Sequence, residues 1–245
     1  AIAFSAIARR LRLGAEGGGT AAIMRYTLRL LTQQQFQRAA HLITALDDLR
    51  RSGAHPRLGE EPFSLGLWIG TGATPAALSD AHQQFQRFVY MPAGDGARNP
   101  FALLGCPCCG TRLVPAGKSE LSAEGVGIRS TTASFAFFCP DPRCHRHDSI
   151  PVQVIDDALY DAPPTMLLGT LDKFAMLAWR PEARAFFGAR GAGAPVRPPS
   201  LIVQDELHLI TGPLGTVSGV YEAAIDAVIA KSGGRTKRLC ATATI

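Results

Sequence analysis

Short apolar runs alternate with amphipathic stretches along this chain, and the alternation predicts strands that alternate with helices. Each run is bounded by Gly, Pro or polar residues, which is typical of a buried strand. Because strands separated by helices usually pair in parallel, we expect an α/β fold with a largely parallel sheet. The expected strands are residues 21–26, 63–69, 165–170, 200–204 and 237–245.

Apolar residues spaced three or four positions apart predict the helices between these strands. Thr32, with Gln35 three residues later, resembles a capping box at the start of the second helix. Shorter helices are expected near residues 76–89 and directly after residue 170. The apolar helix faces comprise Ile2, Ala3, Ala6, Ile7 and Leu11, then Phe36, Ala39, Ala40, Ile43, Leu46 and Leu49, and finally Tyr221, Ala224, Ile225 and Val228.

Residues 101–150 differ from the rest of the chain, because most of the Cys residues lie there, around the apolar strand STTASFAFF. Two close pairs of Cys can present four thiolates to a tetrahedral zinc ion, as in a zinc ribbon. Cys108 is then a spare residue inside the first turn. His145 or His147 remains an alternative to the last ligand, whose pair is spaced slightly wide. The predicted ligands of a structural Zn²⁺ are Cys106, Cys109, Cys139 and Cys144.

The alternative to a structural zinc site is a catalytic zinc site built on His145 and His147, in which an open coordination position would activate water. No Glu accompanies these residues in the arrangement that zinc deaminases use, and four available Cys favour a closed structural site. Two purposes for the ribbon stay open, which are contact with DNA and stabilisation of an insertion that has little core of its own.

Two carboxylates and a histidine, Asp205, Glu206 and His208, follow a short apolar run in PPSLIVQDELH. In open α/β sheets the functional groups lie where strands end. In nucleoside triphosphatases an Asp at such an end holds Mg²⁺ on the phosphates of ATP, and the next acid orients the attacking water. The three residues fit these catalytic roles, with ATP and Mg²⁺ bound at Asp205 and Glu206. Taken alone, the tetrapeptide is better explained as a solvated turn.

Four segments that occur in order resemble the motifs of superfamily 2 helicases of the Asp-Glu-x-His type. They are RYTLRLLTQQQ, GTLDKF, QDELH and ATATI. Longer stretches, among them GTLDKFAMLAW and PPSLIVQDELHLITGPLGTVSGVYEAAID, are similar to the DrmA family, the helicase-like subunits of the DISARM anti-phage defence system. The resemblance implies a RecA-like (P-loop NTPase-type) lobe made of residues 1–100 and 151–245, with residues 101–150 inserted as a β-rich zinc ribbon.

The resemblance further implies an ATP-dependent helicase or translocase that moves on single- or double-stranded DNA in anti-phage defence. Other subunits of a defence system would be its partners. Such a lobe grips the nucleic-acid backbone without reading sequence. Taken one at a time, the residues that the resemblance implies can also be explained as a helix cap, a strand residue or a solvated charge. The implied nucleic-acid contacts are Thr27, Arg29, Gln33, Thr170, Asp172 and Lys173, with Arg25 weaker, and the implied coupling residues are Thr242 and Thr244.

The chain departs from the family's pattern, because it has no Gly-x-x-x-x-Gly-Lys-Ser/Thr phosphate loop, and Leu171 stands where Pro is usual. It opens within an expected helix and closes within an expected strand, so we expect it to be part of a longer protein. The phosphate loop would precede it, and a second lobe with an arginine finger would follow. By itself the chain should hydrolyse ATP poorly. The alternative function is a non-catalytic zinc-ribbon scaffold that binds DNA or protein.

Composition and charge exclude few of the functions considered above. The 25 basic and 20 acidic residues give a net charge of +5, which permits a polyanionic partner without requiring one. No apolar run approaches the ~20 residues of a membrane span, so no membrane partner is expected. Close Cys pairs without a secretory signal favour a cytoplasmic metalloprotein. Arg9, Arg10 and Arg12 form a basic cluster that nucleic-acid contact and a solvated helix end explain equally well. We also expect Trp68 and Trp179 in the core and Cys240 buried.

Overall fold

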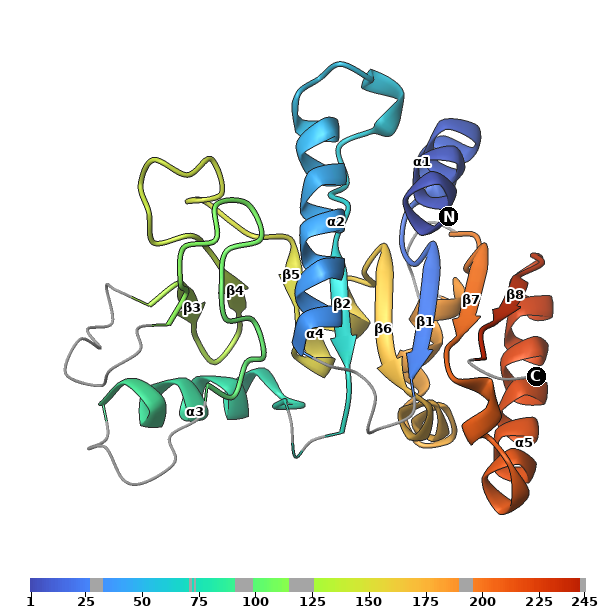
Figure 1. The fold of residues 1–245 in the computed structure, drawn as a ribbon. Helices are drawn as coiled ribbons and strands as arrows, with labels where there is room; N and C mark the ends of the chain where they lie inside the picture. Colours follow the sequence, from blue (N-terminus) through green and yellow to red (C-terminus); the bar gives the residue numbers. More distant parts are fainter. Residues whose placement is uncertain are drawn as a thin grey trace.

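The protein is built around one six-stranded sheet in which every neighbouring pair of strands is parallel (Figure 1). The computed structural model describes residues 1–26, 33–70, 72, 74–90, 99–114, 126–189 and 196–242. Across the sheet the order is β5-β2-β6-β1-β7-β8. The strands are β1 (Ala22–Tyr26), β2 (Leu65–Trp68), β5 (Val152–Gln153), β6 (Met166–Thr170), β7 (Leu201–Gln204) and β8 (Lys237–Cys240).

Helices flank this sheet as the apolar periodicity predicts. The α-helices are α1 (Ile2–Leu13), α2 (Gln33–Arg51), α3 (Leu78–Tyr90), α4 (Asp156–Asp161) and α5 (Gly212–Lys231). The two-residue strand β5 and the short helix α4 have no equivalent in the sequence prediction. The expected α/β architecture is confirmed, and the parallel sheet with flanking helices fits a RecA-like fold.

The segment after β6 is helical, as expected, but it forms the 3-10 helix η5 (Leu171–Ala178) instead of an α-helix. Its buried apolar residues Leu171, Phe174 and Leu177 are spaced by three. Because a 3-10 helix has three residues per turn, this spacing places all three side chains on one face, against the sheet. A second 3-10 helix, η6 (Pro181–Phe187), packs beside it.

Two apolar layers cover the two faces of the sheet, as successive strand residues point to opposite sides. In β6, Met166 and Leu168 join the layer that contains α2, whereas Leu167 joins the layer that contains η5, η6 and α5. Both faces are therefore buried in the middle of the sheet, which is the usual condition for a parallel sheet.

The Cys-rich segment contains a small antiparallel pair, β3 (Ile128–Ser130) and β4 (Phe135–Phe137). Its buried Phe101 and Phe137 belong to the same apolar cluster as Phe36 of α2. The segment therefore packs onto the α2 side of the sheet and shares its core. Within the described ranges, no helix has the length and apolar character needed to cross a bilayer.

The basic residues of α1 correct one expectation, because Arg9 and Arg10 are only 4% and 3% exposed. Arg9 donates to the carbonyls of Pro198, at 2.6 Å, and Gly17, at 3.0 Å. Arg10 donates to the carbonyl of Glu61 at 3.0 Å. These side chains satisfy loop carbonyls that would otherwise be buried without partners. Burial lowers the pKa of Arg9 to about 10.

Two apolar expectations are also wrong. Trp179 is 78% exposed because it follows the end of η5, beyond the buried face, whereas Trp68 is in the core as expected and packs edge-on against Phe174 and Phe186. Cys240 is exposed, since β8 is the outermost strand of the sheet described by the structure. Neither position could be distinguished from a core position by residue type alone.

Candidate functional site

The carboxyl ends of the six parallel strands lie at one edge of the sheet, and the turn that carries the predicted catalytic residues lies there. The backbone N–H of Asp205 donates to the carbonyl of Arg25 at 3.1 Å, which extends the pairing of β7 with β1. On the other side, the N–H of Leu207 donates to the carbonyl of Ala241 at 2.9 Å. The turn after β7 is therefore fixed between the ends of β1 and β8.

Glu206 has a left-handed backbone, with φ 51° and ψ 49°. Such a conformation costs roughly 1–3 kcal/mol for a residue with a side chain, and it recurs at functional sites. The Asp205 side chain stabilises it by accepting the N–H of Glu206 at 3.0 Å. Burial and the charge of Asp205 raise the pKa of the neighbouring Tyr26 to about 12. The phenol therefore stays neutral beside the carboxylates at physiological pH.

His208 joins the predicted catalytic and coupling residues. Its Nδ1 lies 3.3 Å from Oε2 of Glu206 and 3.2 Å from Oγ1 of Thr242, which follows β8. One imidazole therefore contacts both the second acid of the Asp-Glu-x-His turn and the end of the next strand. Thr244, the other predicted coupling residue, lies outside the described residues.

The predicted nucleic-acid contacts are placed in different ways. Thr27 and Arg29 lie outside the described residues. Gln33 begins α2, and its Nε2 donates to the carbonyl of Ala102 at 2.5 Å. Thr170 ends β6 with a buried hydroxyl that has no hydrogen-bond partner within the described ranges, and Asp172 is exposed two residues later.

Lys173 corrects the expectation of a surface cation, because it is 5% exposed. Its Nζ lies 2.6 Å from Oδ2 of Asp156 in α4 and 5.9 Å from the centroid of the Trp68 ring. Burial raises the pKa of Asp156, and the ammonium of Lys173 opposes that rise. A charge held in this buried pair is not available to a DNA phosphate.

Lys173→Met should therefore lower the free energy of unfolding by about 3–5 kcal/mol, because the carboxylate of Asp156 would be left buried without its partner. Chemical denaturation measures the loss. Asp157→Asn, at the exposed neighbour of Asp156, is the matched control and should change stability little. The double substitution Lys173→Met and Asp156→Leu should recover most of the loss. Unchanged stability with weaker DNA binding would restore Lys173 as a phosphate contact.

A second buried charge, Arg25, lies in an ion network that sequence reasoning missed. Arg25 is 4% exposed and pairs with Glu222 of α5. The other oxygen of Glu222 accepts from Nε of Arg238 in β8 at 3.0 Å, and Arg238 also pairs with Asp226 at 2.6 Å. The network ties β1 and β8 to α5. The only hint in the sequence is the four-residue spacing of the two acids on one helix face.

The Cys-rich segment forms two tight turns that face each other. In the first, the N–H of Cys106 donates to the carbonyl of Thr111 at 2.8 Å, and Gly110 closes the turn with φ 78°, a conformation that glycine adopts without strain. In the second, the N–H of Cys139 donates to the carbonyl of Arg146 at 2.9 Å. Local hydrogen bonds therefore aim two thiols from each turn at a common centre.

Four sulfur atoms gather at that centre, and all lie within 4.8 Å of one another. The Sγ atoms of Cys106 and Cys144 are 3.9 Å apart, and those of Cys109 and Cys139 are 3.5 Å apart. Four thiolates bound to zinc at ~2.3 Å in a tetrahedron are separated by about 3.8 Å. The geometry fits a structural zinc ion and agrees with the predicted set of four cysteines.

The neighbouring histidines do not belong to this group of sulfur atoms and have other partners. Nδ1 of His147 lies 2.8 Å from the carbonyl oxygen of Cys139, and Nε2 of His145 lies 3.1 Å from Oδ1 of Asp48. The spare thiol of Cys108 lies 3.6 Å from the same nitrogen of His145. The cluster is thus complete with cysteines alone, and it does not have the open position of a catalytic zinc site.

The thiols differ in acidity. Burial raises the pKa of Cys106 and of Cys139. Burial acts in the same direction at Cys109, but hydrogen bonds that involve Thr111 and Cys139 outweigh it and lower the pKa to about 6. One thiolate is therefore ready at neutral pH, and a metal must displace protons from its neighbours.

Comparison with known proteins gives one informative match. The chain is 33% identical over 270 residues to the DISARM protein DrmA of Bacillus paralicheniformis. The match covers 93% of this chain and 23% of that protein, so the chain corresponds to about a quarter of the relative's length. No family model matches the chain. The resemblance to DrmA that the sequence motifs indicate is confirmed.

Proposed function

We propose, from the likeness to the DISARM protein DrmA, that this chain contributes an ATP-handling lobe to a helicase or translocase that moves on DNA in anti-phage defence. The observation that carries the proposal is the position of His208, which contacts both Glu206 and Thr242 at the carboxyl edge of the sheet. A residue in this position can transmit a change at the acids to the neighbouring strand.

The acids of the turn have the chemistry to serve ATP. Mg²⁺ prefers carboxylate oxygens and retains several waters, and Asp205 and Glu206 are both partly accessible at the strand end. When bound, ATP would supply a phosphoryl group for transfer to water, and Mg²⁺ would offset the negative charge of the phosphates. We assign Asp205 to holding the metal, Glu206 to orienting the attacking water and His208 to sensing the state of Glu206.

The DNA-contacting surface is proposed at the same edge of the sheet, where β1 and β6 end. Gln33 and Asp172 supply polar groups beside the strand ends, and Thr27 and Arg29 belong to the connection between β1 and α2. Small polar groups and backbone N–H groups suit a surface that holds phosphates without reading bases. Lys173 is left out of this set because its charge is buried. Other subunits of the defence system remain the proposed protein partners.

The contact between His208 and Thr242 makes a direct prediction. In the full-length protein, Thr242→Val should lower the stimulation of ATP hydrolysis by DNA about five- to tenfold, which corresponds to the loss of one hydrogen bond. DNA affinity and ATP affinity should change little, because neither ligand is assigned to the hydroxyl. Stimulated hydrolysis is compared with Thr236→Val, which changes a hydroxyl that bonds the carbonyl of Pro199 at the other end of β8. An equal effect of both substitutions would contradict a coupling role.

A non-catalytic scaffold that binds DNA or protein through its zinc ribbon is the second candidate function. The observation that favours it is that the chain lacks a Gly-x-x-x-x-Gly-Lys-Ser/Thr loop, while its four-cysteine centre is complete. The two functions differ in one measurable property. The scaffold predicts DNA or protein binding that neither consumes ATP nor depends on Glu206.

A further inference from the structure

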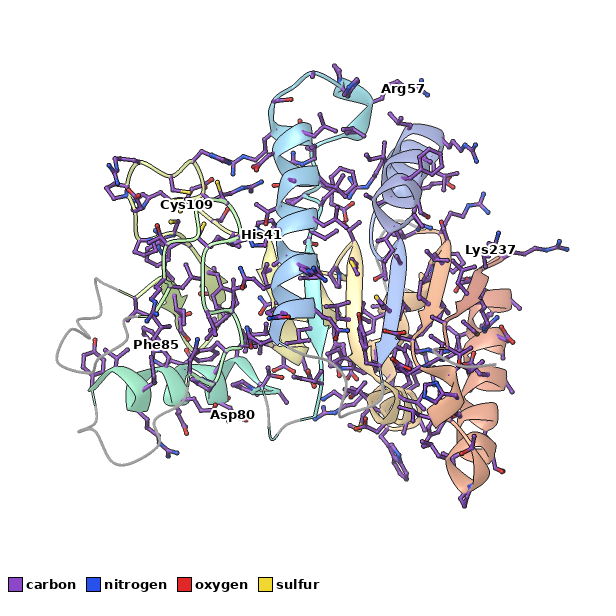
Figure 2. All side chains as sticks on the ribbon, in the orientation of Figure 1. His41, Arg57, Asp80, Phe85, Cys109 and Lys237 are labelled. Carbon is purple, nitrogen blue, oxygen red and sulfur yellow. The ribbon has the colours of Figure 1, made fainter. Side chains whose placement is uncertain are left out.

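Helix α2 carries a polar stripe that bonds to the Cys-rich segment, although Gln33 and His41 stay exposed to solvent. Gln33, Gln37 and His41 are spaced by four residues, and each makes a hydrogen bond to a backbone carbonyl of that segment. The acceptors belong to Ala102 at 2.5 Å, Gly105 at 3.1 Å and Pro107 at 2.5 Å, respectively. Figure 2 labels His41 on α2 and Cys109 in the neighbouring segment. The last two acceptors lie in or beside the first cysteine turn.

The second cysteine turn is fixed to the same helix by Arg146, which is 1% exposed. Its guanidinium donates to Oδ2 of Asp47 at 2.8 Å, to Oδ1 of Asp48 at 2.5 Å and to the carbonyl of Thr44 at 3.3 Å. The backbone carbonyl of Arg146 accepts from Cys139. The backbone of Arg146 therefore closes the metal-binding turn, and its side chain forms hydrogen bonds with α2.

Asp47 connects these hydrogen bonds to other buried residues of the core. Its Oδ1 accepts from Nε of Arg50 at 2.7 Å and from the N–H of Phe63, which precedes β2, at 3.1 Å. Buried charges are tolerated only when they are paired and hydrogen-bonded, so a shift of Arg146 would leave Asp47 partly unsatisfied. The position of the second turn and the position of α2 along its axis are thus mechanically linked.

This arrangement does more than attach the Cys-rich segment. Apolar contacts already join the segment to the core of the sheet, and such contacts are non-directional. The hydrogen bonds of the stripe and of Arg146 are directional. With the ion pair of Arg51 and Asp148, at 2.8 Å, they are distributed along α2 from its first residue to its last turn. They fix the register of α2 against both turns. Only residues 27–32 separate the start of α2 from the end of β1.

We propose that the metal at the four cysteines sets the position of α2 through Arg146 and the polar stripe, and thereby sets the nucleic-acid affinity of the sheet edge at which α2 begins. Arg146 is a positioning residue in this scheme, since it is not one of the four ligands and its side chain bonds to α2. The inference about affinity rests on the proposed function. The link between the metal-binding turns and α2 does not, because the contacts that carry it lie within the described residues.

The test uses the zinc-loaded full-length protein and the substitution Arg146→Met. Zinc content should remain one equivalent at the four cysteines, because all the ligands are intact. Hydrogen exchange at the amides of α2 should become faster, and affinity for a short DNA at low salt should fall about tenfold, a typical coupling effect. Arg143→Met is the matched control, since the side chain of Arg143 is 89% exposed and pairs with Asp141 of its own turn. It should leave all three quantities unchanged.

Arg146→Met alone leaves the buried carboxylate of Asp47 without this partner, so the single variant can fold poorly. The double variant with Asp47→Asn removes that negative charge and provides a second, better-folded protein for the same measurements. The double variant should still loosen α2 and weaken DNA binding. Normal affinity in either folded variant would overturn the proposed link to DNA. Unchanged exchange at α2, both in the variants and after zinc is removed from the wild type, would overturn the link between metal and helix. If the wild type binds no DNA, the proposed function fails. Hydrogen exchange then still tests whether the metal sets the position of α2.

Discussion

Glu206→Gln in the full-length protein is expected to lower DNA-stimulated ATP hydrolysis by about 10²- to 10⁴-fold, the usual contribution of a positioned acid–base group. The substitution preserves the size of the side chain and its contact with Nδ1 of His208, but it removes the charge that would orient and polarise the attacking water. The affinity for ATP should stay within a few-fold of wild type, because Asp205 and the phosphate-binding groups are unchanged. Steady-state hydrolysis and equilibrium nucleotide binding measure the two effects separately.

Glu182→Gln provides the control, since Glu182 is exposed on η6 and undergoes the same chemical change away from the strand ends. Hydrolysis that persists in the Glu206 variant would remove the assigned role from that residue. If neither the variant nor the wild type hydrolyses ATP, although both fold and bind zinc, the scaffold function is favoured.

The parts of this site that sequence predicts are those determined by local pattern. Asp205 and Glu206 follow an apolar run, and the ends of parallel strands meet at one edge, so their location could be deduced without coordinates. The cysteine set was also accessible, because each pair lies on one short turn. The contact between His208 and Thr242 could not be predicted in the same way, because it depends on β7 and β8 being neighbours in the sheet.

Buried charges mark where sequence reasoning failed. Arg9, Arg25, Arg146 and Lys173 are polar residues that a helical or strand pattern assigns to solvent, yet each is at most 5% exposed. Their partners come from other elements, as when Arg146 pairs with Asp47 across 99 positions. Periodicity identifies which residues are apolar, but it cannot show which polar residues of a helix bond to another segment. The polar stripe of α2 is therefore indistinguishable from a solvated face in the sequence.

Loss of the metal is expected to have the largest effect on stability. Cys106→Ser or Cys139→Ser should abolish stoichiometric zinc binding and destabilise the Cys-rich segment, because the four thiols come from both turns and a metal would join the turns directly, in addition to the core and the hydrogen bonds that they share with α2. Binding free energies of structural zinc reach about 10–16 kcal/mol in small peptides, so even a fraction of that value would exceed the effect of an ordinary core substitution.

Zinc stoichiometry and thermal unfolding measure the outcome, and Cys108→Ser is the matched control, since its exposed thiol lies outside the cluster. A lost metal with unchanged stability would show that the core and the hydrogen bonds shared with α2 maintain the segment without it. The dependence on pH gives an independent check. Because burial raises the pKa of Cys106 and Cys139, zinc must displace their protons, so apparent zinc affinity should rise with pH and fall on acidification. A pH-independent affinity would mean that these thiols are not the ligands, and the link from the metal through Arg146 to α2 would lose its anchor.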